Sequence, residues 1–498
     1  MAGGACTSGG PSPTPTPTAS GEVLRFGYPS EPPTLDPLGA GGASAATRDI
    51  LRPVLPSLFR LNARLRPEPD LAARWPGPAD IGLDPFSVRL TLRRANWSDG
   101  RPITAEDVRF SLDRLKRGPT GYRYRFLTAV DVHGPREFTL RFDRRVRRWW
   151  SLFSFDDMVL PAHAYSDAWQ TRPTVSGGPF AVGEWTEGLR VRLVRNESYW
   201  GPKPILAGID VVFVPDDETR FQLLERGELD AFFSEGEINI GRRARARGHQ
   251  PVGGPLEGEG AASGAWGPTW WELGIERGTG PGVSRAIVEA TDPSLVAEIL
   301  EDSGAVMDGI PAVFPVRAGR IGGAWAGRGD LAEARDAAGR GGERTIDITF
   351  PRGAGGALAT FMHFRLRHVG ITAELLGLED DAFERILDTE EPQVVLRLRR
   401  GADAADAAAY ASASGEPGAG PVDDDVERAE TGGAGDALTP GLDREGWVRA
   451  QEGLERAAAA APLARVRTWI VGREGVAGPH ALGASTGPLW NAEAWRFL

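Results

Sequence analysis

The stretch that most constrains the fold is Ala95–Leu115, ANWSDGRPITAEDVRFSLDRL, because it specifies a strand end, a turn and a helix start in succession. Ser98-Asp99-Gly100 is typical of a turn after a strand that ends near Trp97. Thr104 offers a hydroxyl N-cap, and Asp107, three residues later, has capping-box spacing. Apolar residues then recur at helical spacing, at Val108, Leu112 and Leu115. The segment predicts a capped amphipathic helix that follows a strand and a turn.

The length and charge of the chain limit the classes of protein it can be. Its 498 residues exceed the roughly 250–300 at which a single core stops growing, so two or more lobes are expected. The net charge of −11 argues against nucleic acid or an anionic membrane surface as the main partner. No window reaches the roughly 18 continuous apolar residues that a membrane helix requires.

The only cysteine, Cys6, lies in an unusual context. A single cysteine excludes a disulfide within the chain and cysteine-based metal sites. Small residues precede it, and residues 7–21 form a Ser/Pro/Thr/Gly-rich tether that cannot pack a core. This junction resembles that of a bacterial lipoprotein, which implies a lipid anchor on Cys6, although Gly3 stands where that pattern has leucine. The alternative is a free thiol on a disordered tail.

Hydrophobic patterns along the chain predict alternating strands and helices. Residues 241–265 are rich in glycine and arginine and are expected to be a loop, and residues 401–440 are expected to be loop-rich. A helix is expected over Leu358–Val369 and another over Trp447–Ala461. Strands are expected at Val23–Gly27, Phe86–Leu92, Ile209–Val214, Leu229–Phe233, Ile346–Phe350, Ile371–Leu375 and Val394–Leu398.

Several sequence blocks resemble one family, in that family's order. The WSDG-to-TAEDV stretch of Ala95–Leu115 carries the most specific resemblance, to the bacterial extracellular solute-binding proteins of family 5, the dipeptide-, oligopeptide- and nickel-binding receptors of ABC importers. The supporting blocks are EPPTLDP (31–37), GGPF (177–180), NESYW (196–200), RGELD (226–230), SRAI (284–287) and HVGI (368–371).

The resemblance implies an α/β fold with two lobes, of the periplasmic-binding-protein type (cluster C), with an extra subdomain on lobe I and a hinge between the lobes. Lobe I is expected to comprise residues 22–60, 176–268 and 476–498, with residues 61–175 as the extra subdomain. Residues 269–475 are expected to form lobe II, and residues 1–21 the tether. A solute that contacts both lobes only in the closed state would favour closure.

The same resemblance implies candidate ligand-binding residues. Trp270 and Trp271 are placed at the cleft, where flat rings can stack on a ligand, although alternation along a strand lets only one of them face it. The alternative is a core tryptophan. Asp403 is placed where oligopeptide-binding members carry an acidic residue for the peptide's α-ammonium group, with Asp406 as a rival and a solvated loop carboxylate as the alternative.

Three further residues are assigned to the cleft on weaker grounds: Glu31, Phe233 and Tyr122, with Tyr124 as an alternative to the last. No metal site or cofactor is expected. His363 and His368 are five residues apart and point about 140° apart on a helix, so they cannot chelate one metal. The segments 242–248, 274–280 and 401–420 depart from the family's pattern and leave the identity of the solute open.

The expected function is that of an extracytoplasmic receptor of an ABC importer, anchored to the cell membrane through lipid alone and working as a monomer. It would capture a peptide or similar small solute and deliver it to the permease, without catalysis. Alternatives are an oligosaccharide receptor of the same fold, a protein whose second lobe no longer binds solute, and a serine hydrolase. The hydrolase would use Ser485, in the Gly483–Gly487 motif, together with His480. A nucleophile elbow needs a helix after this motif, but Pro488 follows it directly.

Overall fold

A computed structural model describes residues 21–39, 41–42, 44–61, 67–118, 121–146, 149–153, 157–235, 237–251, 265–275, 279–301, 304–305, 329–339, 344–379, 382–383, 386, 392–400, 460–478, 487–489 and 491–498. Within these ranges, no helix combines the length and the hydropathy that crossing a bilayer would need.

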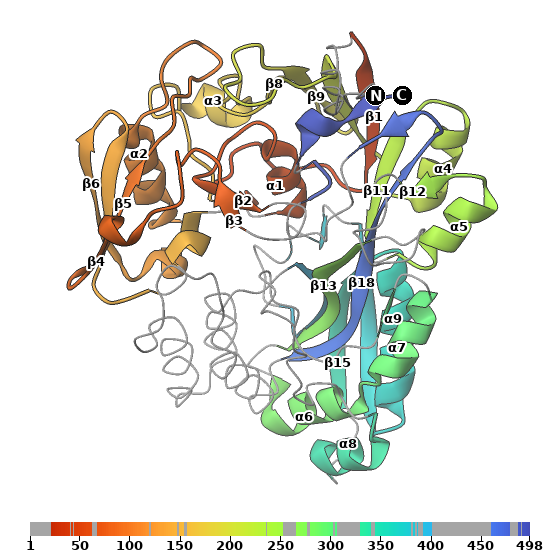
Figure 1. Ribbon diagram of the computed structural model, residues 1–498. Helices are drawn as coiled ribbons and strands as arrows, with labels where there is room; N and C mark the ends of the chain where they lie inside the picture. The colour runs from red at the N-terminus through yellow and green to blue at the C-terminus, as the bar shows by residue number, and fades with distance from the viewer. Residues whose placement is uncertain are drawn as a thin grey trace, which may run out of the picture.

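One mixed sheet runs through the described chain, in the strand order β16-β15-β17-β13-β18-β11-β1-β10-β9-β8 (Figure 1). The strands of this path are β1 (Val23–Tyr28), β8 (Phe180–Thr186), β9 (Arg190–Arg195), β10 (Gly208–Phe213), β11 (Ala231–Glu235), β13 (Ala265–Ile275), β15 (Arg344–Pro351), β16 (Ile371–Leu378), β17 (Val394–Arg400) and β18 (Ala460–Gly472). Two short strands, β12 (Gln250–Pro251) and β14 (Gly304–Ala305), pair with β18 beside this path.

Lobe I contains the half of this sheet formed by β11, β1, β10, β9 and β8. β1 lies between β10 and β11 and is parallel to both, whereas β9 is antiparallel to its neighbours β10 and β8. β10 and β11 are mainly apolar and mostly buried, and Phe26 of β1 and Val211 of β10 are fully buried. β9 instead alternates arginine with apolar residues and buries its apolar face. The helices of this half are α1 (Ala45–Leu51), α4 (Asp217–Glu225) and α5 (Ile240–Ala246).

A four-stranded antiparallel sheet, in the order β4-β5-β7-β6, forms the subdomain on lobe I (Figure 1). Its strands are β4 (Ile81–Leu83), β5 (Phe86–Thr91), β6 (Leu127–Gly134) and β7 (Glu137–Phe142), and α2 (Ala105–Leu115) lies with them. The predicted helix start is confirmed, because the backbone N–H of Thr104 donates to Asp107 Oδ2 at 2.8 Å. The same carboxylate accepts from the N–H of Ala162 at 3.0 Å and so fixes α2 to the following loop.

Smaller elements complete lobe I: β2 (Phe59–Leu61), β3 (Pro67–Pro69), α3 (Asp167–Thr171), β19 (Val476–Ala477), β20 (Arg496–Phe497), and 3-10 turns at Pro78–Asp80, Gly121–Tyr124, Trp149–Phe153 and Ala492–Ala494. The side chains of the subdomain and of the β1–β10 half share one hydrophobic core.

Lobe II has a separate core around β13, β17, β15 and β16. Its helices are α6 (Pro281–Ala290), α7 (Pro293–Leu300), α8 (Leu331–Ala338) and α9 (Ala354–Arg367). The stripe predicted for α9 is confirmed at Leu358, Met362 and Leu366, which are fully buried in this core. Figure 1 shows α7 and α9 side by side along one flank of this lobe.

β18 joins the two lobes (Figure 1). Its first part pairs with β13 of lobe II, and its last residues, Thr468–Gly472, pair with β11 of lobe I. The register between β13 and β18 shifts between Trp266 and Trp270, around Pro268, which has no N–H to donate to a neighbouring strand. The sheet is therefore continuous across the lobes but irregular where they join.

Two sequence predictions about these segments are wrong. Residues 241–265 do not form a single loop, since α5 extends into this range from Ile240 and β12 lies within it. The helix forms through tertiary contact: Gly241 lies against Trp469 of β18 so closely that a Cβ there would be 2.2 Å from the indole. The helix expected over Trp447–Ala461 does not reach its predicted end, because Ala460 begins β18. The residues before Ala460 lie outside the described chain.

Candidate functional site

The carboxyl ends of β1, β10 and β11 lie at the edge of the lobe I sheet that adjoins lobe II. Parallel strands end at the same edge, and α/β proteins bind ligands there. Contacts between the lobes lie beside this edge: the N–H of Asn239 donates to Leu300 O at 3.4 Å, and Arg242 forms an ion pair with Glu301. Glu237 lies against Gly353, at the start of α9. The loops after these strands are therefore the candidate solute-binding region.

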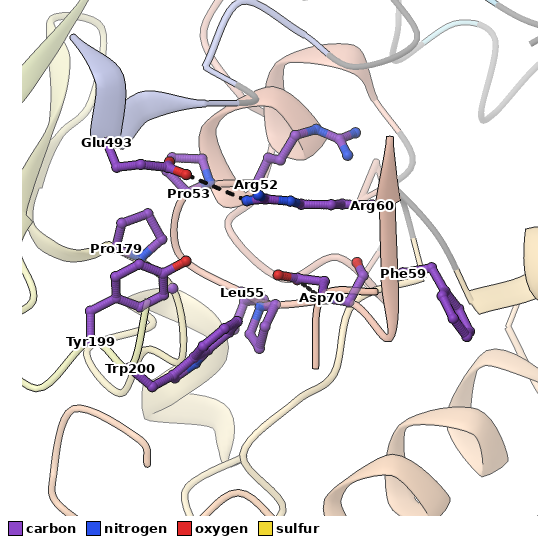
Figure 2. Close-up of a pocket in the computed structure, with 13 residues that line it drawn as sticks. Arg52, Pro53, Leu55, Phe59, Arg60, Asp70, Pro179, Tyr199, Trp200 and Glu493 are labelled. Carbon is purple, nitrogen blue, oxygen red and sulfur yellow. Dashed lines mark hydrogen bonds and ion pairs between the residues drawn. The ribbon is translucent and has the colours of Figure 1, made fainter. Parts of the chain in front are cut away.

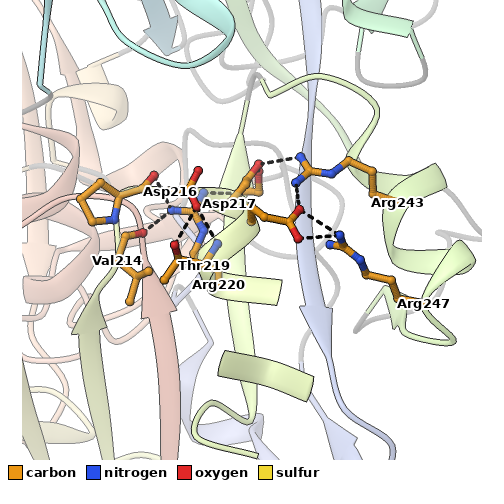
Figure 3. A network of polar contacts seen from close by, with 10 residues as sticks. Val214, Asp216, Asp217, Thr219, Arg220, Arg243 and Arg247 are labelled. Carbon is orange, nitrogen blue, oxygen red and sulfur yellow. Dashed lines mark hydrogen bonds and ion pairs between the residues drawn. The ribbon is translucent and has the colours of Figure 1, made fainter. Parts of the chain in front are cut away.

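A buried network fixes the loop between β10 and α4 (Figure 3). Arg220, only 1% exposed, forms an ion pair with Asp217 and donates to the carbonyls of Val214 and Pro215. Ser234 of β11 donates to Asp217 Oδ2 at 3.2 Å. These bonds tie the ends of β10 and β11 to the first turn of α4.

Asp216 caps α4 beside this network. Its carboxylate accepts from Thr219 N at 2.6 Å and from Thr219 Oγ1 at 2.7 Å. Burial alone would raise the pKa of Asp216, but the bonds from Thr219 outweigh it and hold that pKa below its usual value. The carboxylate therefore stays ionised and stabilises the helix N-terminus.

α5 is held on α4 by a carboxylate shared between two arginines (Figure 3). Glu218 accepts from Arg247 at 2.7 and 2.8 Å and from Arg243 at 3.0 Å. These hydrogen bonds lower the pKa of Glu218. Both guanidinium groups also lie over the ring of Phe221, at 5.1 Å for Arg243 and 4.5 Å for Arg247.

Glu31, predicted to line the cleft, lies just beyond the end of β1. Its carboxylate accepts from Trp185 Nε1 at 2.8 Å and from the N–H of Gly188 at 3.0 and 2.9 Å. Glu31 thus fixes the turn between β8 and β9. Its assignment as a ligand-binding residue stays a prediction.

Two other predicted residues lie in hydrophobic cores. Phe233, 1% exposed, stacks on Tyr28 with ring centroids 5.7 Å apart. Trp271, 2% exposed, packs in the lobe II core together with Leu273. In this conformation both side chains offer a solute almost no surface, and their binding roles stay predictions.

The remaining predicted residues fall wholly or partly outside the described chain. The backbones of Tyr122 and Trp270 lie in a 3-10 turn and in β13, but their side chains are not described. The alternative to Tyr122, Tyr124, is buried and bonded to Asp157. The residues that lie wholly outside are Cys6, Asp403, Asp406, His480 and Ser485.

The sequence blocks that resemble family 5 meet around the start of β8 and form hydrogen bonds with one another. Ser98 N donates to Ser176 O at 2.7 Å, and Trp200 Nε1 donates to Gly177 O at 2.9 Å. Asn196 Nδ2 donates to Gly178 O at 2.8 Å. The WSDG, GGPF and NESYW blocks are therefore packing and hydrogen-bonding partners of one another.

Beside these blocks, lobe I holds a cavity of about 50 Å³ (Figure 2). Sequence reasoning missed it, although the NESYW block supplies two of its walls. The cavity is lined by Arg52, Pro53, Leu55, Pro56, Ser57, Phe59, Arg60, Asp70, Gly178, Pro179, Tyr199, Trp200 and Glu493. Among the residues that the structure describes, no group of three or more His, Cys, Asp or Glu side chains is placed to hold a metal ion.

Residues 66–255 match the family model of the bacterial extracellular solute-binding proteins, family 5, middle region. This segment belongs to family 5. The resemblance found in the sequence is thereby confirmed.

Curated relatives agree with this assignment. A segment of 227 residues is 27% identical to the probable D,D-dipeptide-binding periplasmic protein DdpA of Escherichia coli. The aligned segment covers 42% of this chain and 42% of DdpA. Another is 27% identical over 314 residues to protein XP55 of Streptomyces lividans, covering 52% of this chain and 55% of the relative. The chain thus spans about half the length of these relatives.

Solved structures confirm the fold over nearly the whole chain. The binding protein MoaA of Agrobacterium tumefaciens, in complex with mannopinic acid, superposes with a TM-score of 0.78 and 23% identity, over 96% of this chain and all of the other. The oligopeptide-binding protein AppA of Bacillus subtilis, in complex with a nonapeptide, gives a TM-score of 0.77 and 14% identity, over 97% of this chain and all of the other. The predicted two-lobed α/β fold of the periplasmic-binding-protein type is therefore confirmed.

Proposed function

We propose that this chain is the extracytoplasmic receptor of an ABC importer, which captures a peptide or similar small solute by closing its lobes and delivers it to the permease. The observation that carries the proposal is the architecture. A family 5 segment lies in a two-lobed fold, and the long strand β18 pairs with strands of both lobes. The named similar proteins with a stated ligand all take small solutes: DdpA is described as a probable D,D-dipeptide-binding protein, MoaA is in complex with mannopinic acid, and AppA is in complex with a nonapeptide.

The physics of capture follows from the junction between the lobes. β18 and β13 are the described strands that run between the halves, and their pairing is irregular around Pro268. Rotation there changes few hydrogen bonds, because the ladder is already interrupted. A solute bound by both lobes at once adds contacts in the closed state alone and shifts the population toward it.

The proposal also includes the residues that contact the solute, the boundaries of the lobes and the attachment of the chain to the membrane. Trp270, Asp403 and Tyr122 are proposed to contact the solute, and lobe I, the subdomain and lobe II are proposed to divide the chain at the boundaries given above. Cys6 is proposed to carry the lipid, so metabolic labelling with a radioactive fatty acid should mark the chain and should fail in Cys6→Ser. No bond-making chemistry is proposed.

Small-angle X-ray scattering and thermal melting test the receptor. Di- to nonapeptide pools should reduce the radius of gyration and raise Tm, because a ligand at 100 times its Kd stabilises the native state by about 2.7 kcal/mol. Maltooligosaccharides and nickel–histidine serve as comparison solutes. A response to maltooligosaccharides alone would identify the solute as an oligosaccharide in place of a peptide. A radius of gyration that no solute class changes would contradict capture by closure.

A further inference from the structure

The cavity in lobe I is lined by residues of that lobe alone and is distinct from the candidate solute-binding region between the lobes. We propose that it is a second binding site, which takes a small organic cation with a guanidinium or primary ammonium head. The inference goes beyond the receptor function and does not depend on it.

Three oxygen-bearing side chains point into the same space from distant parts of the chain (Figure 2). Asp70 follows β3, Tyr199 follows β9, and Glu493 lies near the carboxyl terminus. Asp70 accepts one hydrogen bond, from the N–H of Ser57 at 3.1 Å, through Oδ2. Within the described chain this carboxylate forms no ion pair, so Oδ1 remains available to a donor.

Tyr199 supplies a second acceptor. The residue is only 8% exposed, and its hydroxyl makes no hydrogen bond to any other described residue. The hydroxyl oxygen itself is not fully enclosed, so it can accept a hydrogen bond from, or donate one to, a molecule that enters the cavity. Its orientation toward Asp70 indicates that the partner belongs in the cavity (Figure 2).

The charges around the cavity favour a cation. Arg60 is already committed, at 2.8 Å to Glu68 and at 3.4 Å to Glu493. Burial raises the pKa of Asp70 in spite of Arg60 and Arg93, with a smaller contribution from Glu68. Burial also raises the pKa of Glu493 in spite of Arg60, and the charge of Asp70 adds to that increase. The arginines therefore do not fully compensate the two acids, and a bound cation would do so.

The walls and the size select an organic cation of few atoms. Tyr199 and Trp200 present aromatic surface, although Arg93 already lies 4.7 Å from the ring centroid of Trp200, and proline rings cover other sides of the space. Aromatic faces attract ammonium and guanidinium groups. A cavity needs roughly 10–15 Å³ to hold one water molecule. A cavity of about 50 Å³ therefore has room for about four heavy atoms, the number in guanidinium.

Isothermal titration calorimetry on the full chain tests this site, with methylammonium, guanidinium and sodium acetate as separate titrants at equal ionic strength. Both cations are expected to bind with one-to-one stoichiometry, whether or not a peptide saturates the interlobe region. Asp70→Asn should weaken cation binding at least tenfold, and Tyr199→Phe should weaken it severalfold. The matched control is Asp131→Asn, which removes an exposed carboxylate paired with Arg141 outside the cavity and should leave the affinity unchanged.

Glu493→Gln gives a second test should Asp70→Asn fail to fold, with the same expected loss. Saturable acetate binding in place of cation binding would show that Arg52 and Arg60 define an anion site and would overturn the proposal. Absence of saturable heat with either cation would also overturn it. Neither result would affect the receptor function, which is tested separately by peptide-induced compaction.

Discussion

Gly178 lies so close to Pro53 that a side chain does not fit. A Cβ at this position would be 2.3 Å from the Pro53 carbonyl oxygen. Gly178→Ala is therefore expected to lower the free energy of unfolding by about 1–3 kcal/mol, the usual cost of overpacking. Urea unfolding followed by circular dichroism measures this change. Gly134→Ala is the control, since nothing lies within 4 Å of its Cβ; equal losses in both variants would contradict the steric explanation.

Asp230 makes part of the stability dependent on pH. Its carboxylate is 1% exposed and accepts from Arg25 Nη2 at 2.7 Å and from Arg473 Nε at 2.8 Å. Burial alone would raise the pKa of Asp230, but the bonds from Arg25 and Arg473 hold it below its usual value. A lowered folded-state pKa stabilises the native state above the unfolded pKa of about 4 and loses that contribution as pH falls through the folded pKa.

Asp230→Asn is therefore expected to lower the free energy of unfolding at pH 7 by about 2 kcal/mol. The difference from the unmutated chain should shrink as pH falls below about 4. Urea titrations at pH 7, 5 and 3.5 follow it. A difference that stays constant or grows toward acid would contradict the assigned ionisation.

At the residue scale, the sequence predicted those features that depend on residues close together in the chain. Thr104 and Asp107 are three residues apart, so their capping bond was predictable from spacing alone. The cavity in lobe I was not, because Arg60 and Glu493 are separated by 433 positions and meet only through the fold. The two cleft candidates Phe233 and Trp271 illustrate the same limit, since a family block locates a strand but not which face it buries.

At the element scale, α5 depends on its partners more than on its own sequence. Its seven residues are too few for stable helix in isolation. Glu218→Gln weakens the bonds to Arg243 and Arg247 and should make the amides of Ile240–Ala246 exchange with solvent about three- to tenfold faster, as measured by hydrogen–deuterium exchange. Glu106→Gln is the matched control. Glu106 forms an ion pair with Arg109, three residues later, in which both side chains are exposed, so the pair contributes little to stability. Unchanged exchange in α5 would show that Trp469 alone holds the helix.

Elements with strong periodicity were predicted well, and elements formed by tertiary contact were not. β1, β15 and α9 appear where apolar patterns placed them, because each buries its stripe in a core of its own lobe. α5 carries four arginines in or beside it and reads as a loop until Glu218 and Trp469 are known to face it. The alanine-rich start of β18 resembles a helix, but its pairing with β13 makes it a strand.

At the scale of the whole molecule, two cores share one sheet. The side chains of lobe I and of lobe II form separate clusters, and a third, smaller cluster surrounds Trp469 where β18 meets α4 and α5. Cooperative units of unfolding follow such clusters of buried contacts. The lobes are therefore expected to open and unfold separately in the absence of solute, even though their strands are hydrogen-bonded neighbours.

A matched pair of cavity-forming variants separates shared from independent stability. Leu366→Ala in α9 and Leu193→Ala in β9 each remove a fully buried leucine, from lobe II and lobe I respectively, at a cost of about 2–5 kcal/mol. Hydrogen–deuterium exchange should quicken in β15, β16 and α9 with the first variant, and in β1, β9 and β10 with the second. Faster exchange in both lobes from either change would show that β18 couples them into one folding unit. Separate responses that merge when a solute is bound would show that the ligand, rather than the shared strand, makes the molecule cooperative.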